Sequence, residues 1–342
     1  MRGDDRTMTT NIDTKQLKRD ASPHLKVSRS SQWVMQQVLV ALMFPFIAAI
    51  YFFGWRVILM VGVGIVSALL TEYSYQKLTN KIITIQDGSA AITGALISLS
   101  LPVTAPLWTI VIGNLFAIII VKQLPGGLGR NVFNPAIAAR VMLKLFFSPW
   151  ITNWVLPGVD FVSTATPLET IGNWTPVVGA EVPGLWDLFL GNQLGGPVGE
   201  TSKLMILLGM VYLVARRIIP LHLPLLYLGG LAIVTALYGD FSYVYYMTHL
   251  LSGTAFFAAT YMVTDYSSQP LTPDGKIIFA LLAGILTGII RIVFDFPGGV
   301  GIAILIMNGC SPWLDRYLAP KVYGHKKRIK NNKAARQRVK RT

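Results

Sequence analysis

Long apolar stretches alternate with short polar turns along most of this chain. A helix that crosses a bilayer needs about 20 apolar residues, and somewhat fewer where it is packed inside a bundle. We therefore expect an all-α polytopic membrane protein with about ten transmembrane helices. The predicted helices span residues 33–53, 57–76, 89–101, 107–121, 132–147, 203–215, 223–238, 248–263, 276–294 and 300–318.

The composition agrees with a membrane location. Of 342 residues, 53% are hydrophobic and 13% are charged, whereas a soluble chain has about 25% charged residues. The first thirty residues are polar, so we expect no cleavable signal peptide.

Basic residues are concentrated in the two tails. Residues 319–342 hold ten Lys and Arg and no acid, and residues 1–30 hold seven against four acids. Basic flanks of membrane helices stay in the cytoplasm, and they can also contact anionic lipid of the bilayer. We predict two cytoplasmic tails and expect no nucleic-acid partner; a nucleic-acid-binding arm is the alternative.

A polar interval, residues 148–202, separates the predicted helices into two groups of five. It contains no Lys or Arg, so we expect it on the outer face of the membrane. Pro-Gly-Gly-Leu-Gly at 125–129 recurs as Pro-Gly-Gly-Val-Gly at 297–301. Five helices in each unit would invert the second unit, so we predict two inverted repeats, 31–147 and 203–318, as in many transporters. The alternative is that Pro-Gly-Gly is ordinary turn sequence.

Residues 160–168, Asp-Phe-Val-Ser-Thr-Ala-Thr-Pro-Leu, stand out in the polar interval. Small neighbours leave the Thr166 hydroxyl uncrowded, and Pro167 favours an extended backbone there. A hydroxyl presented in this way can accept a phosphoryl group. The alternative reading is an ordinary Ser/Thr-rich loop.

This motif, with Asp160, Ser163 and Thr166, resembles the flavinylation motif of a membrane flavoprotein family. The family contains the D subunit of the Rnf complex and the B subunit of the sodium-pumping NADH:quinone oxidoreductase. The resemblance implies one covalent FMN joined through a phosphoester to Thr166, a flavin transferase that attaches it, and other membrane and peripheral subunits as partners. Thr164 departs from the Gly or Ser more usual before Ala165, and a second, non-covalent flavin stays open.

A second group of residues follows the first Pro-Gly-Gly turn: Arg130, Asn134 and Arg140, with Lys144 one helical turn beyond Arg140. Asn134-Pro135 interrupts the apolar run, and Arg140 and Lys144 share one helix face. Cations within a membrane usually face a partner or a polar cavity, and this pair would suit a flavin phosphate or a reduced flavin ring. Alternatively, both side chains reach the interface. The segment also resembles the same family.

For the other polar residues in or near the predicted helices, we predict structural roles. We expect Arg291 to pair with Asp295 four residues on, Asp265 to cap the next turn, and the 199–202 segment to cap the helix that follows it. Asp265 lining an ion path, and phosphate contact at 199–202, are the alternatives.

The sequence lacks the usual ligands of other redox cofactors. Its single cysteine, Cys310, cannot hold an iron–sulfur cluster alone, and four scattered histidines form no metal or haem set. We therefore expect no metal site and no catalytic residue in this chain, so electrons must come from neighbouring subunits.

The resemblance thus implies a subunit, inactive alone, of an oxidoreductase in the bacterial inner membrane that passes electrons between ferredoxin and NAD and moves Na⁺ or H⁺. Within the family, the quinone-reducing subunit usually has a longer N-terminal region, which favours the Rnf type. The alternatives are that quinone-reducing subunit, a channel or secondary transporter without cofactor, and a scaffolding subunit.

Overall fold

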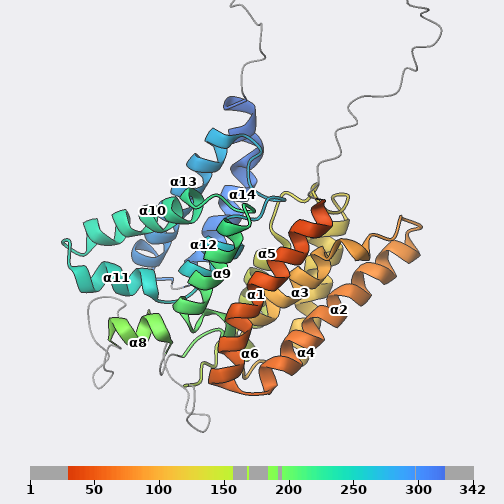
Figure 1. The fold of residues 1–342 in the computed structure, drawn as a ribbon, viewed down its shortest axis with the longest axis horizontal. Helices are drawn as coiled ribbons and strands as arrows, with labels where there is room; N and C mark the ends of the chain where they lie inside the picture. The colour runs from red at the N-terminus through yellow and green to blue at the C-terminus, as the bar shows by residue number, and fades with distance from the viewer. Residues whose placement is uncertain (1–29, 157–167, 169–183, 192–194, 297, 320–342) are drawn as a thin grey trace, which may run out of the picture. The chain divides into compact units, whose positions relative to one another are not determined.

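The computed structural model describes residues 30–156, 168, 184–191, 195–296 and 298–319 as a helical protein (Figure 1). The first unit of the chain, Met1–Ser30, is almost entirely outside these residues, and all the described helices belong to the second, Ser31–Thr342. They are α1 (Ser31–Phe53), α2 (Arg56–Leu78), η1 (Ile85–Asp87), α3 (Ser89–Leu99), α4 (Leu107–Leu115), η2 (Phe116–Gln123), α5 (Pro135–Phe146), α6 (Ser148–Ile151), α8 (Leu185–Leu190), η4 (Val198–Glu200), α9 (Lys203–Ala215), α10 (His222–Tyr238), α11 (Tyr243–Leu251), α12 (Ala255–Tyr261), α13 (Pro273–Val293) and α14 (Gly299–Tyr317).

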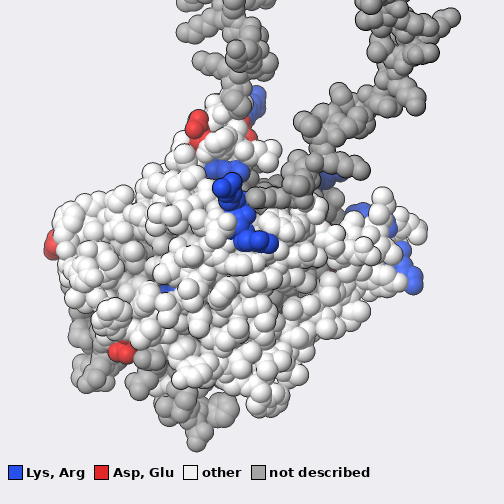
Figure 2. Space-filling model, in the orientation of Figure 1, with Lys and Arg blue, Asp and Glu red and all other residues white. Residues whose placement is uncertain are grey.

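Three described helices, α1, α2 and α13, are long and apolar enough to cross a membrane by themselves, and α3, α9 and α10 are shorter apolar helices. The face in Figure 2 is almost free of charged residues over its middle, with Lys and Arg gathered toward the upper edge. Large apolar side chains are exposed on the long helices, such as Ile47 and Leu70. This surface suits a hydrocarbon environment and supports the expected polytopic membrane protein.

Two pairs of helices approach closely at glycines. A Cβ on Gly94 of α3 would lie 2.2 Å from the Gly64 carbonyl oxygen of α2, and a Cβ on Gly284 of α13 would lie 2.0 Å from the Tyr227 carbonyl oxygen of α10. Small residues at such crossings are the usual means of packing membrane helices, because lipid offers no hydrophobic drive for association. The α2–α3 and α10–α13 contacts are the most extensive in the described fold (Figure 1).

Two short helices lie inside this framework. Every residue of α3 is buried, and all of α12 except Phe256 is buried. Neither is long enough to cross a bilayer, because 11 residues of helix extend only about 16 Å. Half-length helices of this kind leave backbone groups inside the protein that other groups must satisfy.

The sequence prediction needs correction at several helix boundaries. The expected single helix 248–263 is broken, since α11 ends at Leu251 and α12 starts at Ala255. Gly253 between them has φ +62°, a left-handed conformation that glycine adopts without steric cost. The expected helix 107–121 changes to π-helix from Phe116 to Gln123. The polar interval, expected to be loop, includes short helices α6, α8 and η4.

The helix predicted from residue 132 begins instead at Pro135. The Asn134 side chain accepts hydrogen bonds from the backbone N–H groups of Ala136 and Ile137, and Pro135 occupies the first turn, where its missing N–H costs nothing. The Asn134 amide also donates to Asp265 at 3.1 Å. The cap therefore fixes both the start of α5 and its contact with the α12–α13 connection.

A buried ion pair joins α2 to the π-helix. Lys122 Nζ lies 2.7 Å from Glu72 Oε1, and their side chains are 2% and 0% exposed. Lys122 also donates to the Ser89 hydroxyl, and Gln123 and Gln76 donate to the same Glu72 oxygen. Charged groups inside a membrane protein need such partners, because their desolvation is costly.

Candidate functional site

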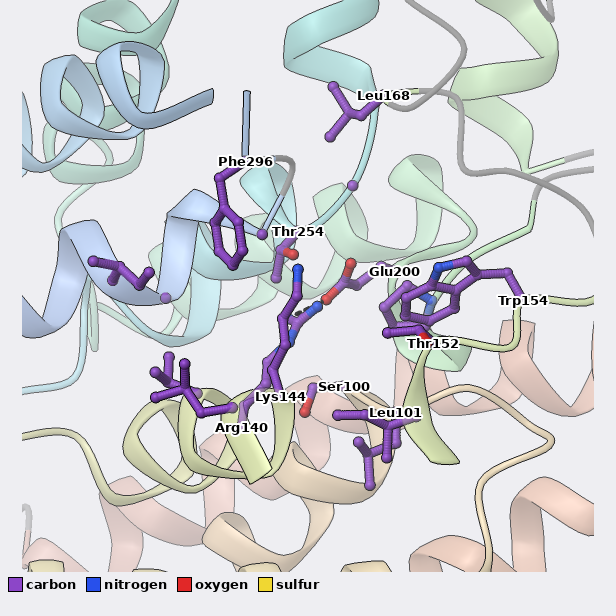
Figure 3. A pocket seen from close by; sticks show the side chains of 18 residues that line it. Ser100, Leu101, Arg140, Lys144, Thr152, Trp154, Leu168, Glu200, Thr254 and Phe296 are labelled. Carbon is purple, nitrogen blue, oxygen red and sulfur yellow. Dashed lines mark hydrogen bonds and ion pairs between the residues drawn. The ribbon is translucent and has the colours of Figure 1, made fainter. Parts of the chain in front are cut away.

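The described residues enclose a pocket where α3, α5, η4, α12 and the start of α14 meet (Figure 3). Its empty space, counted together with the open solvent at its mouth, is about 870 Å³. The lining residues are Ser100, Leu101, Arg140, Val141, Lys144, Leu145, Ile151, Thr152, Trp154, Leu168, Pro197, Glu200, Gly253, Thr254, Phe296, Gly298, Gly301 and Ile302.

Two cations from α5 extend into this pocket. Arg140 and Lys144, one turn apart, point between the rings of Trp154 and Phe296 in Figure 3. Arg140 Nη1 lies 2.6 Å from Glu200 Oε1, and Lys144 Nζ lies 4.0 Å from the centre of the Phe296 ring. The expected shared face is confirmed, and both cations line a cavity.

Glu200 is the acid of the described pocket wall, and it is 2% exposed. Its Oε1 accepts from Arg140, whereas its Oε2 is buried and has no hydrogen-bond partner among the described residues. The Lys203 ammonium donates to the Glu200 carbonyl oxygen at 2.6 Å. The capping expected of this segment belongs to Ser202, whose hydroxyl accepts from Met205 N at the start of α9. Glu200 lines the pocket instead of capping the helix.

The break between α11 and α12 forms another part of the wall. Gly253 and Thr254 line the pocket, together with Ser100 and Leu101, which directly follow α3. Arg291 of α13 donates to the carbonyl oxygens of His249 and Ser252 at 2.7 and 3.5 Å. Arg291 was expected to pair with Asp295, but it instead satisfies carbonyl groups that the broken helix exposes.

One known protein family covers most of this chain. The model of the NQR2, RnfD and RnfE family matches residues 18–324. This chain belongs to that family.

Curated relatives in the family are similar over almost their whole length. One is the D subunit of the Na⁺-translocating ferredoxin:NAD⁺ oxidoreductase complex of Acetobacterium woodii, 39% identical over 92% of this chain and 97% of the relative. Another is the D subunit of the proton-translocating ferredoxin:NAD⁺ oxidoreductase complex of Clostridium ljungdahlii, 35% identical over 89% and 95%. A third is the D subunit of the ion-translocating oxidoreductase complex of Yersinia pseudotuberculosis, 35% identical over 90% and 98%.

The residues predicted from the flavinylation motif of the family, Asp160, Ser163 and Thr166, lie outside the described residues. Leu168, two positions after Thr166, is described, is buried and lines the pocket. Its Cδ1 lies 2.9 Å from the position that a Cβ on Gly253 would occupy. The end of the motif segment therefore packs against the break between α11 and α12.

The other predicted residues separate into two groups. Arg140 lines the pocket, whereas Arg130 is exposed in the turn before α5 and Asn134 caps that helix, and neither is a lining residue. Asp265 accepts hydrogen bonds from Ser267 and Ser268, which confirms its expected turn-capping role.

Sequence reasoning missed the aromatic and backbone parts of the pocket. Trp154 and Phe296 lie in connections without periodicity, and they are 142 positions apart. The available signals were Trp154, one of four tryptophans in the polar interval, and the second Pro-Gly-Gly turn directly after Phe296. Neither signal indicates which distant segment it will meet.

Proposed function

We propose that this chain is the FMN-carrying D subunit of an Rnf-type ion-translocating ferredoxin:NAD⁺ oxidoreductase complex in the membrane. Family membership supports the role, together with similarity to three D subunits over about nine-tenths of the chain. The relatives are named for Na⁺, protons and ions in general, so the proposal covers Na⁺ or H⁺ as the coupling ion. The other subunits of the complex supply and remove the electrons.

The observation that carries the flavin part of the proposal is the position of Leu168 in the pocket wall. Two peptide units join Leu168 to Thr166, which limits the separation of their Cα atoms to about 7 Å. A phosphoester on Thr166 would therefore be tethered near the pocket. The pocket suits a flavin because it combines aromatic walls, Trp154 and Phe296, with the cations Arg140 and Lys144.

The bound FMN would supply electron transfer in steps of one or two electrons. The residues of this chain would position it. Trp154 and Phe296 would flank a planar ring, and aromatic walls favour offset or edge contacts with such a ring. Arg140, held by Glu200, and Lys144 would interact with its negative charge. The apolar wall formed by Leu101, Ile151 and Leu168 would exclude water.

We further propose that the ten predicted spans form two inverted five-helix units, with both termini cytoplasmic and Thr166 on the outer face. The half-length helices α3 and α12 support this, since the residues directly after α3 and directly before α12 line the same pocket. In transporters with inverted repeats, broken helices build the binding site near the membrane midplane. A flavin transferase acting at the outer face would then complete the protein.

The test uses the full chain, expressed with a flavin transferase and purified in detergent. The denatured wild-type chain should fluoresce yellow in a gel, and the peptide containing Thr166 should carry the added mass of FMN. Thr166→Val should lose both signals, while Thr170→Val, the same removal of a hydroxyl outside the 160–168 motif, should keep them. An unmodified Thr166 peptide in the wild type would favour the alternative of a channel or transporter without a covalent flavin.

A further inference from the structure

The described residues around the pocket carry more positive than negative charge. Among the described residues, Arg140 and Lys144 line it, and two more cations lie directly behind it. Lys203 donates to the Glu200 carbonyl oxygen, and Arg291 lies 3.4 Å from the position that a Cβ on Gly253 would occupy. Lys203 and Arg291 both interact electrostatically with Glu200. One described carboxylate therefore faces four cations.

Glu200 holds a specific place in this charge distribution. Its Oε1 is engaged by Arg140, while its buried Oε2 accepts no hydrogen bond from the described residues. Figure 3 shows the Glu200 carboxylate directed into the cavity beside Arg140, with Lys144 extending past it toward Phe296. A ligand in the cavity would meet the negative charge from one side and the Lys144 ammonium from the other.

We propose that Lys144 and Glu200 set the reduction potential of the flavin in this pocket in opposite directions, with Lys144 raising it and Glu200 lowering it. This inference rests on the proposed function. One electron delivered by another member of the complex adds one negative charge to the pocket, unless a proton follows it. Lys144 stabilises that added charge, and Glu200 opposes it. Both charges act more strongly than they would in bulk water, because Glu200 is buried and Lys144 is partly buried, so solvent screens them less.

The opposite signs distinguish this role from a structural one. Lys144→Met removes a positive charge and keeps the length of the side chain, so the potential should fall. Glu200→Gln removes a negative charge and keeps a carbonyl oxygen for Arg140, so the potential should rise. Each change should alter the equilibrium constant for one-electron reduction by about tenfold, which is about 59 mV for a one-electron couple. Damage to the fold would shift both variants in the same direction.

The experiment is a spectroelectrochemical titration of the full chain, purified in detergent with its covalent flavin. Lys77→Met serves as the control, because it removes a lysine that is exposed near the end of α2 and does not line the pocket. Lys144→Arg and Glu200→Asp retain the charges and should stay close to the wild-type potential. These two variants keep the test decisive should either charge-removing variant fold poorly.

The outcomes separate the two proposals. Shifts of opposite sign in Lys144→Met and Glu200→Gln, with no shift in Lys77→Met, support the inference. Shifts of the same sign, or shifts no larger than that of the control, overturn it while in-gel fluorescence still supports the flavin on Thr166. Charge-retaining variants that depart from the wild type as far as the charge-removing ones also overturn it. A colourless wild-type chain overturns both proposals.

Discussion

The buried pair of Lys122 and Glu72 offers a direct measurement of what an ion pair contributes inside this protein. The pair is 2.7 Å long and 2% and 0% exposed. At an effective dielectric constant of about 20, unit charges at that 2.7 Å separation attract by about 6 kcal/mol. Desolvation of the two groups offsets much of this attraction, and removing one partner of a buried pair typically costs about 3–5 kcal/mol.

We therefore expect Lys122→Met to lower the free energy of unfolding by about 3–5 kcal/mol, since it leaves the Glu72 carboxylate with only neutral donors from Gln76 and Gln123. Glu72→Gln should be destabilising for the same reason, because it leaves the Lys122 ammonium without a counter-charge. The double variant buries no charge here. It should be more stable than either single variant.

The assay is an unfolding titration of the detergent-purified chain with a denaturing detergent, monitored by circular dichroism, for the wild type, both single variants and the double variant. Lys77→Met is the control, since exposed substitutions usually change stability by less than about 0.5 kcal/mol. A double variant that loses as much as the two single variants combined would refute the argument. It would mean that the two residues stabilise the fold independently rather than as a pair.

Three further substitutions test the packing and the polar contacts. Gly230→Ala should destabilise the fold by about 1–3 kcal/mol, because the new Cβ would lie 2.5 Å from the Leu281 carbonyl oxygen. The control is Gly229→Ala, whose Cβ would meet nothing within 4 Å, so it should be neutral or stabilising. Thermal unfolding compares the two variants. Asn134→Ala should cost about 0.5–2 kcal/mol through the lost cap, and an unchanged melting temperature would contradict it. Burial raises the pKa of the Asp265 carboxyl above its ordinary 3.8. Between the pKa of the unfolded chain and that of the folded chain, the folded chain therefore keeps a proton that the unfolded chain has lost. Stability should fall as the pH rises between these two values. Asp265→Asn should flatten this dependence, and parallel melting curves against pH would contradict it.

Local chemistry explains what the sequence predicted well. Pro135 and Asn134 mark a helix start because one lacks an N–H and the other supplies a capping acceptor, and the structure places the start there. The long apolar runs likewise gave α1, α2 and α13 to within a few residues. Turn signals and apolar length are properties of neighbouring residues, so a sequence displays them directly.

The contacts of the pocket could not be predicted in the same way. Arg140 meets Glu200 across 60 positions, and Glu200 has an equally good local reading as a helix start. Arg291 and Asp295 have the spacing of an ion pair on one helix face, yet α13 ends at Val293 and Asp295 has φ +46°. The break at Gly253 lies within a continuous apolar run, and its weak signal is a Ser-Gly-Thr sequence. These outcomes depend on which distant segments pack together.

The break between α11 and α12 links the shape of the pocket to its charge. A continuous helix through residue 253 would pair its carbonyl groups in its own hydrogen bonds. It would leave no opening for Gly253 and Thr254 to line a cavity. Breaking it exposes carbonyl groups in a low-dielectric interior, where each needs a donor. Arg291 supplies that donor to His249 and Ser252, and in doing so it brings a positive charge behind the pocket. Arg291 therefore both stabilises the break and contributes to the electrostatic field in which we propose the flavin is reduced. A substitution of Arg291 would change the geometry of the pocket and the reduction potential together.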